Sequence, residues 1–120
     1  MATILLVEDT PANRALATKL LNAAGHDVLT ADNAEAGIVL ARERLPDLVL
    51  MDLGLPDMDG WQALTAIRAD DRSAGLRVIA FTAHAMVGDR ERVLAWGFDG
   101  YLSKPIEFGT FADSVASYLR

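Results

Sequence analysis

Four polar segments, each directly after an apolar run, hold the side chains of this chain best suited to metal and phosphoryl chemistry. They are Glu8-Asp9, Asp52, Thr82 and Ser103-Lys104-Pro105. Carboxylates bind hard cations and act as nucleophiles, whereas hydroxyl and ammonium groups hold phosphoryl oxygens. A single Asp or Thr after an apolar run is most often a turn or cap residue. Four such segments in one short chain favour a shared site.

The elements that must position these residues alternate between strand and helix. Continuous apolar runs over 4–7, 28–31, 48–51, 78–81 and 101–102 are typical of strands buried on both faces of a parallel sheet. Longer amphipathic stretches predict helices from Pro11 to a stop at Gly25, from the cap Asn33 to Pro46, from the cap Asp59, and over about 87–96 and 107–119. The second helix is expected to bury Leu45, and the fifth Phe108. This order indicates βαβ units with helices on both faces of the sheet.

In a parallel sheet the carboxyl ends of the strands share one rim, where ligands bind. Glu8, Asp9 and Asp52 would then repel one another unless a cation neutralises them. The chain has no Cys, and a ligand set made only of oxygen atoms suits Mg²⁺ best. Asp52 is then a nucleophile that forms an acyl phosphate, while Thr82 and Lys104 hold the phosphoryl oxygens.

Composition narrows the class of protein. The chain has 120 residues, a net charge of −6 and 52% hydrophobic residues, which predicts one globular domain. Its acidity argues against a nucleic-acid partner. No apolar run is long enough for a membrane span or a signal peptide, so we expect a cytoplasmic protein with no membrane contact. We expect residues 1–120 to form one domain with no output domain.

The motifs, taken together, resemble a response-regulator receiver domain of two-component signalling. The segments that carry the resemblance are residues 4–9, residues 50–60 with Pro56 and Gly60, Phe81-Thr82-Ala83 and residues 101–105. They occur in order and at the family's spacing over nearly the whole chain. The stretch from Ala83 to Ile106 is similar to DivK-like single-domain regulators and to the receivers of hybrid histidine kinases. The resemblance implies a flavodoxin-like (βα)5 fold, with strand order 2-1-3-4-5.

The resemblance also implies roles for the matching residues. Asp52 would be the phosphoacceptor, which takes a phosphoryl group from a histidine kinase or a histidine phosphotransfer protein. Asp9 would bind Mg²⁺ directly, Glu8 mostly through a water, and Gly54 through its backbone carbonyl. The Lys104–Pro105 bond is expected to be cis.

Further implied roles concern the response to phosphorylation. Thr82 and Lys104 would hold the phosphoryl oxygens, and Tyr101 would turn inward when Thr82 moves toward the phosphate. The kinase would dock on the first helix near Asn13, Arg14 and Ala17. A downstream protein would bind the face made by helix 4, strand 5 and helix 5. His84, two residues after Thr82, is expected either to modulate the lifetime of the phosphoryl group or to be neutral.

Other functions fit the residues less well. A magnesium-dependent phosphatase acting through an aspartyl phosphate would need a second Asp two residues after Asp52, where Gly54 stands. A flavin carrier would need a phosphate loop after the first strand, where the chain is acidic. A scaffold would not need Asp52, Thr82 and Lys104. We therefore expect a signalling protein and not an enzyme, either a stand-alone receiver or a receiver cut from a hybrid histidine kinase.

Overall fold

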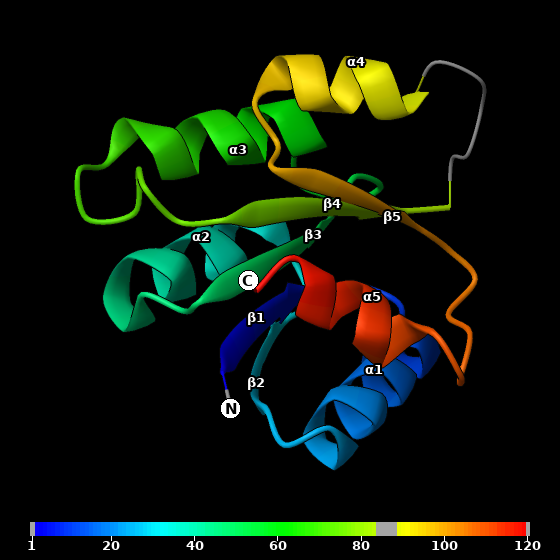
Figure 1. Cartoon of the computed structure of the whole chain (residues 1–120). Coiled ribbons are helices and arrows are strands. Elements are labelled where there is room, and N and C mark those ends of the chain that lie inside the picture. Colours follow the sequence, from blue (N-terminus) through cyan, green and yellow to red (C-terminus); the bar gives the residue numbers. More distant parts are fainter. Residues whose placement is uncertain (1, 84–88, 120) are drawn as a thin grey trace.

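Five parallel strands form the centre of the structure, a computed structural model that describes residues 2–83 and 89–119. The element order is β1 (Thr3–Val7), α1 (Pro11–Ala23), β2 (Asp27–Ala31), α2 (Ala34–Arg44), β3 (Leu48–Asp52), α3 (Gly60–Ala69), β4 (Val78–Thr82), α4 (Asp89–Trp96), β5 (Gly100–Ser103) and α5 (Phe111–Ser117). The strands lie in the order β2-β1-β3-β4-β5 (Figure 1). The predicted doubly wound sheet and its strand order are confirmed.

Helices cover both faces of the sheet (Figure 1). On one face, Leu48 and Leu50 of β3 pack in a core with residues of α1 and α5. On the other, Val49 and Met51 pack in a core with residues of α2, α3 and α4. Both faces of β3 are therefore buried, which explains why its sequence is continuously apolar and does not alternate.

The helices are short, and two of them begin at the expected capping residues. The Asn33 side chain accepts a hydrogen bond from the Ala36 N–H at the start of α2. Asp59 and Gln62 form a capping box at the start of α3. The longest helix, α1, has 13 residues, and no described helix is long and apolar enough to cross a membrane.

Two side chains expected inside the core lie outside it. Leu45 is 51% exposed because it ends α2 in the left-handed conformation, with φ of 46°, and so leaves the buried stripe. Phe108 is 74% exposed because residues 108–110 form a turn and α5 begins only at Phe111. The predicted fifth helix was therefore too long at its amino-terminal end.

The α2 helix packs closely on the strand that leads into Glu8-Asp9. At Gly37, an added Cβ would lie 2.6 Å from Cγ2 of Val7, well inside van der Waals contact. Val7 is fully buried and β-branched, so its side chain has little freedom to move away. The absence of a side chain at Gly37 lets the helix approach the end of β1.

We predict that Gly37→Ala destabilises the protein, although Ala is the better helix former by about 1 kcal/mol. Overpacking against Val7 outweighs that preference, and we expect a net loss of about 1–2 kcal/mol in the free energy of unfolding. Urea denaturation measures the change. The control is Gly109→Ala, where an added Cβ meets nothing within 4 Å. A stability equal to or above that of the wild type in Gly37→Ala would refute the packing argument.

Candidate functional site

The carboxyl ends of four strands meet at one rim of the sheet. Val7 of β1 pairs with Met51 of β3, so Glu8 and Asp52, which follow these two residues, lie at the same level. Asp52 pairs in turn with Phe81 of β4, one residue before Thr82. Thr82 pairs with Ser103 of β5, one residue before Lys104. The parallel register therefore brings together the residues that sequence analysis singled out.

Three carboxylates gather at this rim. Glu8, Asp9 and Asp52 each offer an oxygen atom, and these oxygens lie within 4.8 Å of one another. Glu8 is fully buried, Asp52 is 5% exposed and Asp9 is partly exposed. Two of the three carboxylates are thus removed from water. Inside the protein, their negative charges repel one another strongly unless positive charge compensates them.

Lys104 supplies part of that compensation. Its ammonium forms an ion pair with Oε1 of Glu8 and lies 3.2 Å from Oδ2 of Asp52. It also lies 5.0 Å from the centre of the Phe81 ring. The backbone holds Lys104 in place, because its N–H donates to the Thr82 carbonyl at 2.8 Å. The Lys104–Pro105 bond that follows is cis, as predicted.

Backbone N–H groups orient the two buried carboxylates. The Thr10 N–H donates to Oε2 of Glu8 at 3.1 Å, and the Gly54 N–H donates to Oδ1 of Asp52 at 2.9 Å. Burial nevertheless raises the pKa of Glu8 above its usual value, although the bonds from Lys104 and Thr10 act in the opposite direction. The pocket therefore disfavours the full set of negative charges in the absence of a cation.

The chemistry of the donor set fits Mg²⁺. The cluster offers hard carboxylate oxygens, and one ammonium against three carboxylates leaves two negative charges to balance. Glu8, Asp9 and Asp52 are the residues that would hold the ion. The expected contribution of the Gly54 carbonyl stays a prediction, while its N–H contact to Asp52 places that backbone beside the cluster.

Thr82 and Tyr101 lie on neighbouring strands next to this cluster. Thr82 is 1% exposed at the end of β4. Tyr101 of β5 is partly buried and packs against the core on the α2, α3 and α4 side. The hydroxyl of Tyr118, the residue after α5, lies 3.2 Å from the Tyr101 carbonyl oxygen, to which it donates, and 3.3 Å from the Tyr101 backbone nitrogen, from which it accepts. His84 lies outside the described residues, so its expected modulatory role stays a prediction.

Sequence reasoning missed two contacts of the loops around the cluster. Asp57, in the loop between β3 and α3, accepts hydrogen bonds from the Ala34 and Glu35 N–H groups of α2. Arg14 of α1 donates from Nη1 to the Glu8 carbonyl at 3.0 Å. Asp57 looks like an ordinary turn residue, because its partners lie more than 20 positions earlier in the chain. No local pattern could have predicted that contact.

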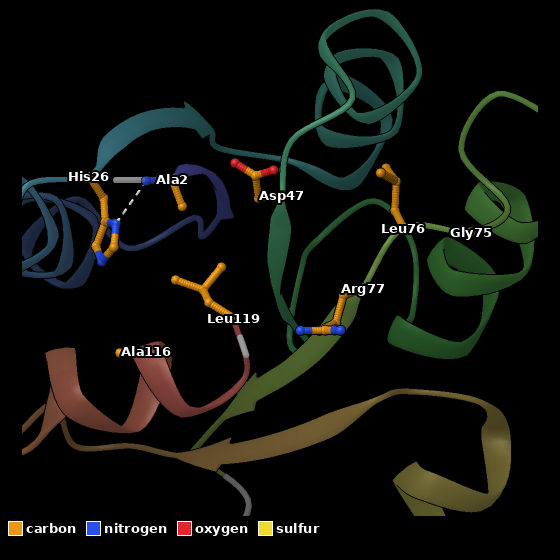
Figure 2. Close-up of a pocket in the computed structure, with 8 residues that line it drawn as sticks. All are labelled: Ala2, His26, Asp47, Gly75, Leu76, Arg77, Ala116 and Leu119. Atoms are coloured by element: carbon orange, nitrogen blue, oxygen red, sulfur yellow. Dashed lines mark hydrogen bonds between the residues drawn. The ribbon is translucent and has the colours of Figure 1, made fainter.

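A cavity of about 630 Å³ lies at the opposite end of the strands from the acidic cluster (Figure 2). Four of its lining residues stand directly before strands β1 to β4, which places it at their amino-terminal ends. Its lining residues are Ala2, His26, Asp47, Gly75, Leu76, Arg77, Ala116 and Leu119. It is therefore distant from the acidic cluster.

Known proteins resemble this chain over nearly its whole length. The sequence model of the response regulator receiver domain family matches residues 4–116. The polar-differentiation response regulator DivK of Brucella anthropi is 38% identical over 117 residues, which are 98% of this chain and 95% of that protein.

Solved structures agree in fold. The receiver domain of a sensor histidine kinase from Pseudomonas aeruginosa PAO1, with a magnesium ion coordinated in its active site cleft, has a TM-score of 0.87 and 33% identity. The match covers 98% of this chain and 97% of that one. The chemotaxis response regulator CheY4 of Vibrio cholerae, at 24% identity, has a TM-score of 0.90 with 98% of each chain covered, which shows a shared fold.

The raised pKa of Glu8 yields a prediction for the metal-free protein. A carboxyl group whose pKa is higher in the folded state than in the unfolded state stabilises the fold at low pH, and this stabilisation is lost as pH rises through the folded pKa. We therefore predict that Glu8→Gln, in EDTA at pH 7, has a higher free energy of unfolding than the wild type.

The difference in the free energy of unfolding between Glu8→Gln and the wild type should shrink as pH falls toward the ordinary pKa range of Glu, because the wild-type carboxyl then becomes neutral as well. Urea denaturation in EDTA at several pH values measures this difference. The matched control is Glu43→Gln, an exposed carboxylate on α2. A Glu8→Gln protein that is less stable than the wild type at pH 7 would contradict the electrostatic argument.

Proposed function

The chain belongs to the response regulator receiver domain family of two-component signalling, and from this premise we propose that Asp52 is its phosphoacceptor. The phosphoryl donor is a histidine kinase or a histidine phosphotransfer protein. The signal passes on by contact with another protein. The observation that carries the proposal is the convergence of Asp52, its acidic neighbours and Lys104 at one rim of the sheet.

The proposed reaction is a direct transfer. A carboxylate oxygen of Asp52 forms the new bond to phosphorus while the bond between phosphorus and the donor's histidine nitrogen breaks. The electron pair of that bond stays on the imidazole, and the product is an acyl phosphate on Asp52. The N–H of Gly54 holds Oδ1 of Asp52, which limits rotation of the carboxylate during attack.

Charge balance is the main task of the surrounding residues. Lys104 already contacts Asp52 and would pair with a phosphoryl oxygen once the acyl phosphate forms. Thr82, buried beside it, would donate a hydrogen bond to another phosphoryl oxygen. When bound by Glu8, Asp9, Asp52 and the Gly54 carbonyl, Mg²⁺ would neutralise the negative charge that accumulates on the transferring group.

We propose separate surfaces of the chain for the phosphoryl donor and for the downstream protein. For the donor we propose the start of α1, where Asn13 and Arg14 are partly exposed. Ala17, expected at the same surface, is fully buried and contributes no contact. The guanidinium of Arg14 is anchored on the Glu8 carbonyl, so this part of α1 is tied directly to the acidic segment.

For the downstream partner we propose the face of α4, β5 and α5. A cavity of about 340 Å³ lies on this face. Its lining residues are Arg90, Tyr101, Leu102, Ser103, Pro105, Glu107, Thr110, Phe111 and Ser114. Tyr101 lines the cavity and also lies one strand away from Thr82, so a change in its side-chain position would alter the surface. The phosphoryl group would drive that change, because Thr82 and Lys104 would bind it more tightly in one of two conformations of the site.

We propose that the acyl phosphate on Asp52 is hydrolysed slowly and that the protein does not turn over as a phosphatase. A phosphatase that works through an aspartyl phosphate needs a general acid close to the nucleophile. Gly54, two residues after Asp52, has no side chain to supply one. The acyl phosphate would therefore persist long enough to carry a signal.

We predict that the wild-type protein gains the mass of one phosphoryl group when incubated with acetyl phosphate and Mg²⁺, and that Asp52→Asn does not. The amide keeps the shape of the side chain but removes the nucleophilic oxygen. Intact mass spectrometry measures the gain. The matched control is Asp47→Asn, which makes the same change directly before β3, at the opposite end of that strand from Asp52. Asp52→Asn protein that is phosphorylated at the wild-type rate would overturn the assignment.

A further inference from the structure

We propose that Asp57 is a positioning residue for the magnesium site, which holds the loop between β3 and α3, and with it the Gly54 backbone, against the first turn of α2. This inference rests on the proposed function, because it concerns the Mg²⁺ held by Glu8, Asp9, Asp52 and the Gly54 carbonyl. It assigns a task to a side chain that lies outside that set of ligands.

The contact is specific and uses both oxygens of the carboxylate. Oδ1 of Asp57 accepts from the Ala34 N–H at 2.9 Å, and Oδ2 accepts from the Glu35 N–H at 3.0 Å. Asn33 accepts from the next N–H of the same turn, that of Ala36, through its own side chain. The Gly37 N–H bonds to the Asn33 carbonyl. Asp57 therefore takes up the two N–H groups of α2 that the helix's own cap leaves available.

The α2 helix is in turn fixed to the other acidic segment. Gly37 lies directly against Val7, the residue before Glu8. The Glu8 N–H also donates to the Ala31 carbonyl at 2.9 Å, at the end of the strand that leads into α2. The first half of α2 thus contacts the end of β1 through packing and the loop after β3 through Asp57. It sets the separation of the two segments that carry the carboxylates.

A displacement at Asp57 would reach Gly54 along a short and constrained path. Only two residues separate them: Leu55, which is 7% exposed and packs in the core, and Pro56, whose ring fixes its backbone φ angle. At the base of the loop, Leu53 at its start packs on Gly60 at its end, where an added Cβ would lie 2.2 Å from a Leu53 methyl group. The packing of Leu53 on Gly60 holds the two ends of the loop together, and the Asp57 carboxylate holds its middle to α2.

Charge favours this contact at neutral pH. The two N–H bonds from the start of α2 lower the pKa of Asp57. A carboxylate at the amino-terminal end of a helix is stabilised by the aligned peptide dipoles as well as by the hydrogen bonds. Asp57 is therefore ionised at neutral pH, and its carboxylate can accept both hydrogen bonds there.

Isothermal titration calorimetry with MgCl₂ tests the proposal on the full chain. We expect Asp57→Ala to bind Mg²⁺ about tenfold more weakly than the wild type, the lower end of what loss of a residue that orients a ligand costs. Asp57→Asn should lie between the two, because its amide keeps one acceptor oxygen. Circular dichroism confirms that each variant is folded, and the Asn variant serves if the Ala variant is not.

The matched control is Asp59→Ala, which removes a helix-capping carboxylate from the same loop but contacts α3 and not α2. It should bind Mg²⁺ with wild-type affinity. Phosphorylation by acetyl phosphate gives a second readout: Asp57→Ala should be slow at limiting Mg²⁺ and recover toward the wild-type rate at saturating Mg²⁺.

The outcomes separate the two proposals. If the wild type binds no Mg²⁺, the proposed function is overturned, and this inference with it. If the wild type binds Mg²⁺ and Asp57→Ala binds it equally well, the positioning role of Asp57 is wrong while the proposed function stands. If Asp59→Ala weakens binding as much as Asp57→Ala, the effect belongs to the loop in general, and the positioning role of the Asp57 contact to α2 is refuted.

Discussion

The structure depends above all on the burial of carboxylates that lack enough positive charge around them. Glu8 and Asp52 lie inside the protein beside Asp9, and the Lys104 ammonium contacts two of the three. Such an arrangement costs free energy in the metal-free protein, as the raised pKa of Glu8 indicates. A divalent cation would balance the two negative charges that Lys104 leaves uncompensated. The pocket is thus organised for ligands that the chain itself does not contain.

The parallel sheet is what makes this burial possible. The strands β1, β3, β4 and β5 end at the same level, so their polar residues meet at the rim while their apolar residues form the cores below. Contacts outside the strands then hold the loops. Arg14 binds the backbone of the first loop, and Asp57 ties the loop after β3 to α2. The rigid sheet sets the spacing of the side chains, and these contacts set the direction of the backbone between them.

Much of this arrangement could be predicted from the sequence, because its determinants are local. A strand buried on both faces must be continuously apolar, so Leu48–Met51 could be recognised, and the polar residue after each strand marked the rim. Asp59 and Asn33 could be recognised as caps because their partners lie three residues away. Leu45 and Phe108 were misplaced because the exact end of a helix depends on a left-handed residue in one case and a turn in the other. The partners of Asp57 come from tertiary structure and carry no local signal.

The most direct test of the central claim is the free energy of unfolding of the wild-type chain as a function of Mg²⁺ concentration. Urea denaturation at neutral pH measures this free energy, with KCl used to keep the ionic strength constant. If the carboxylate cluster binds one cation only in the folded state, the free energy of unfolding rises by about 1.4 kcal/mol for each tenfold increase in Mg²⁺ above the dissociation constant. A free energy of unfolding that does not change with Mg²⁺ would contradict the account, because the buried carboxylates would then be balanced without a metal ion.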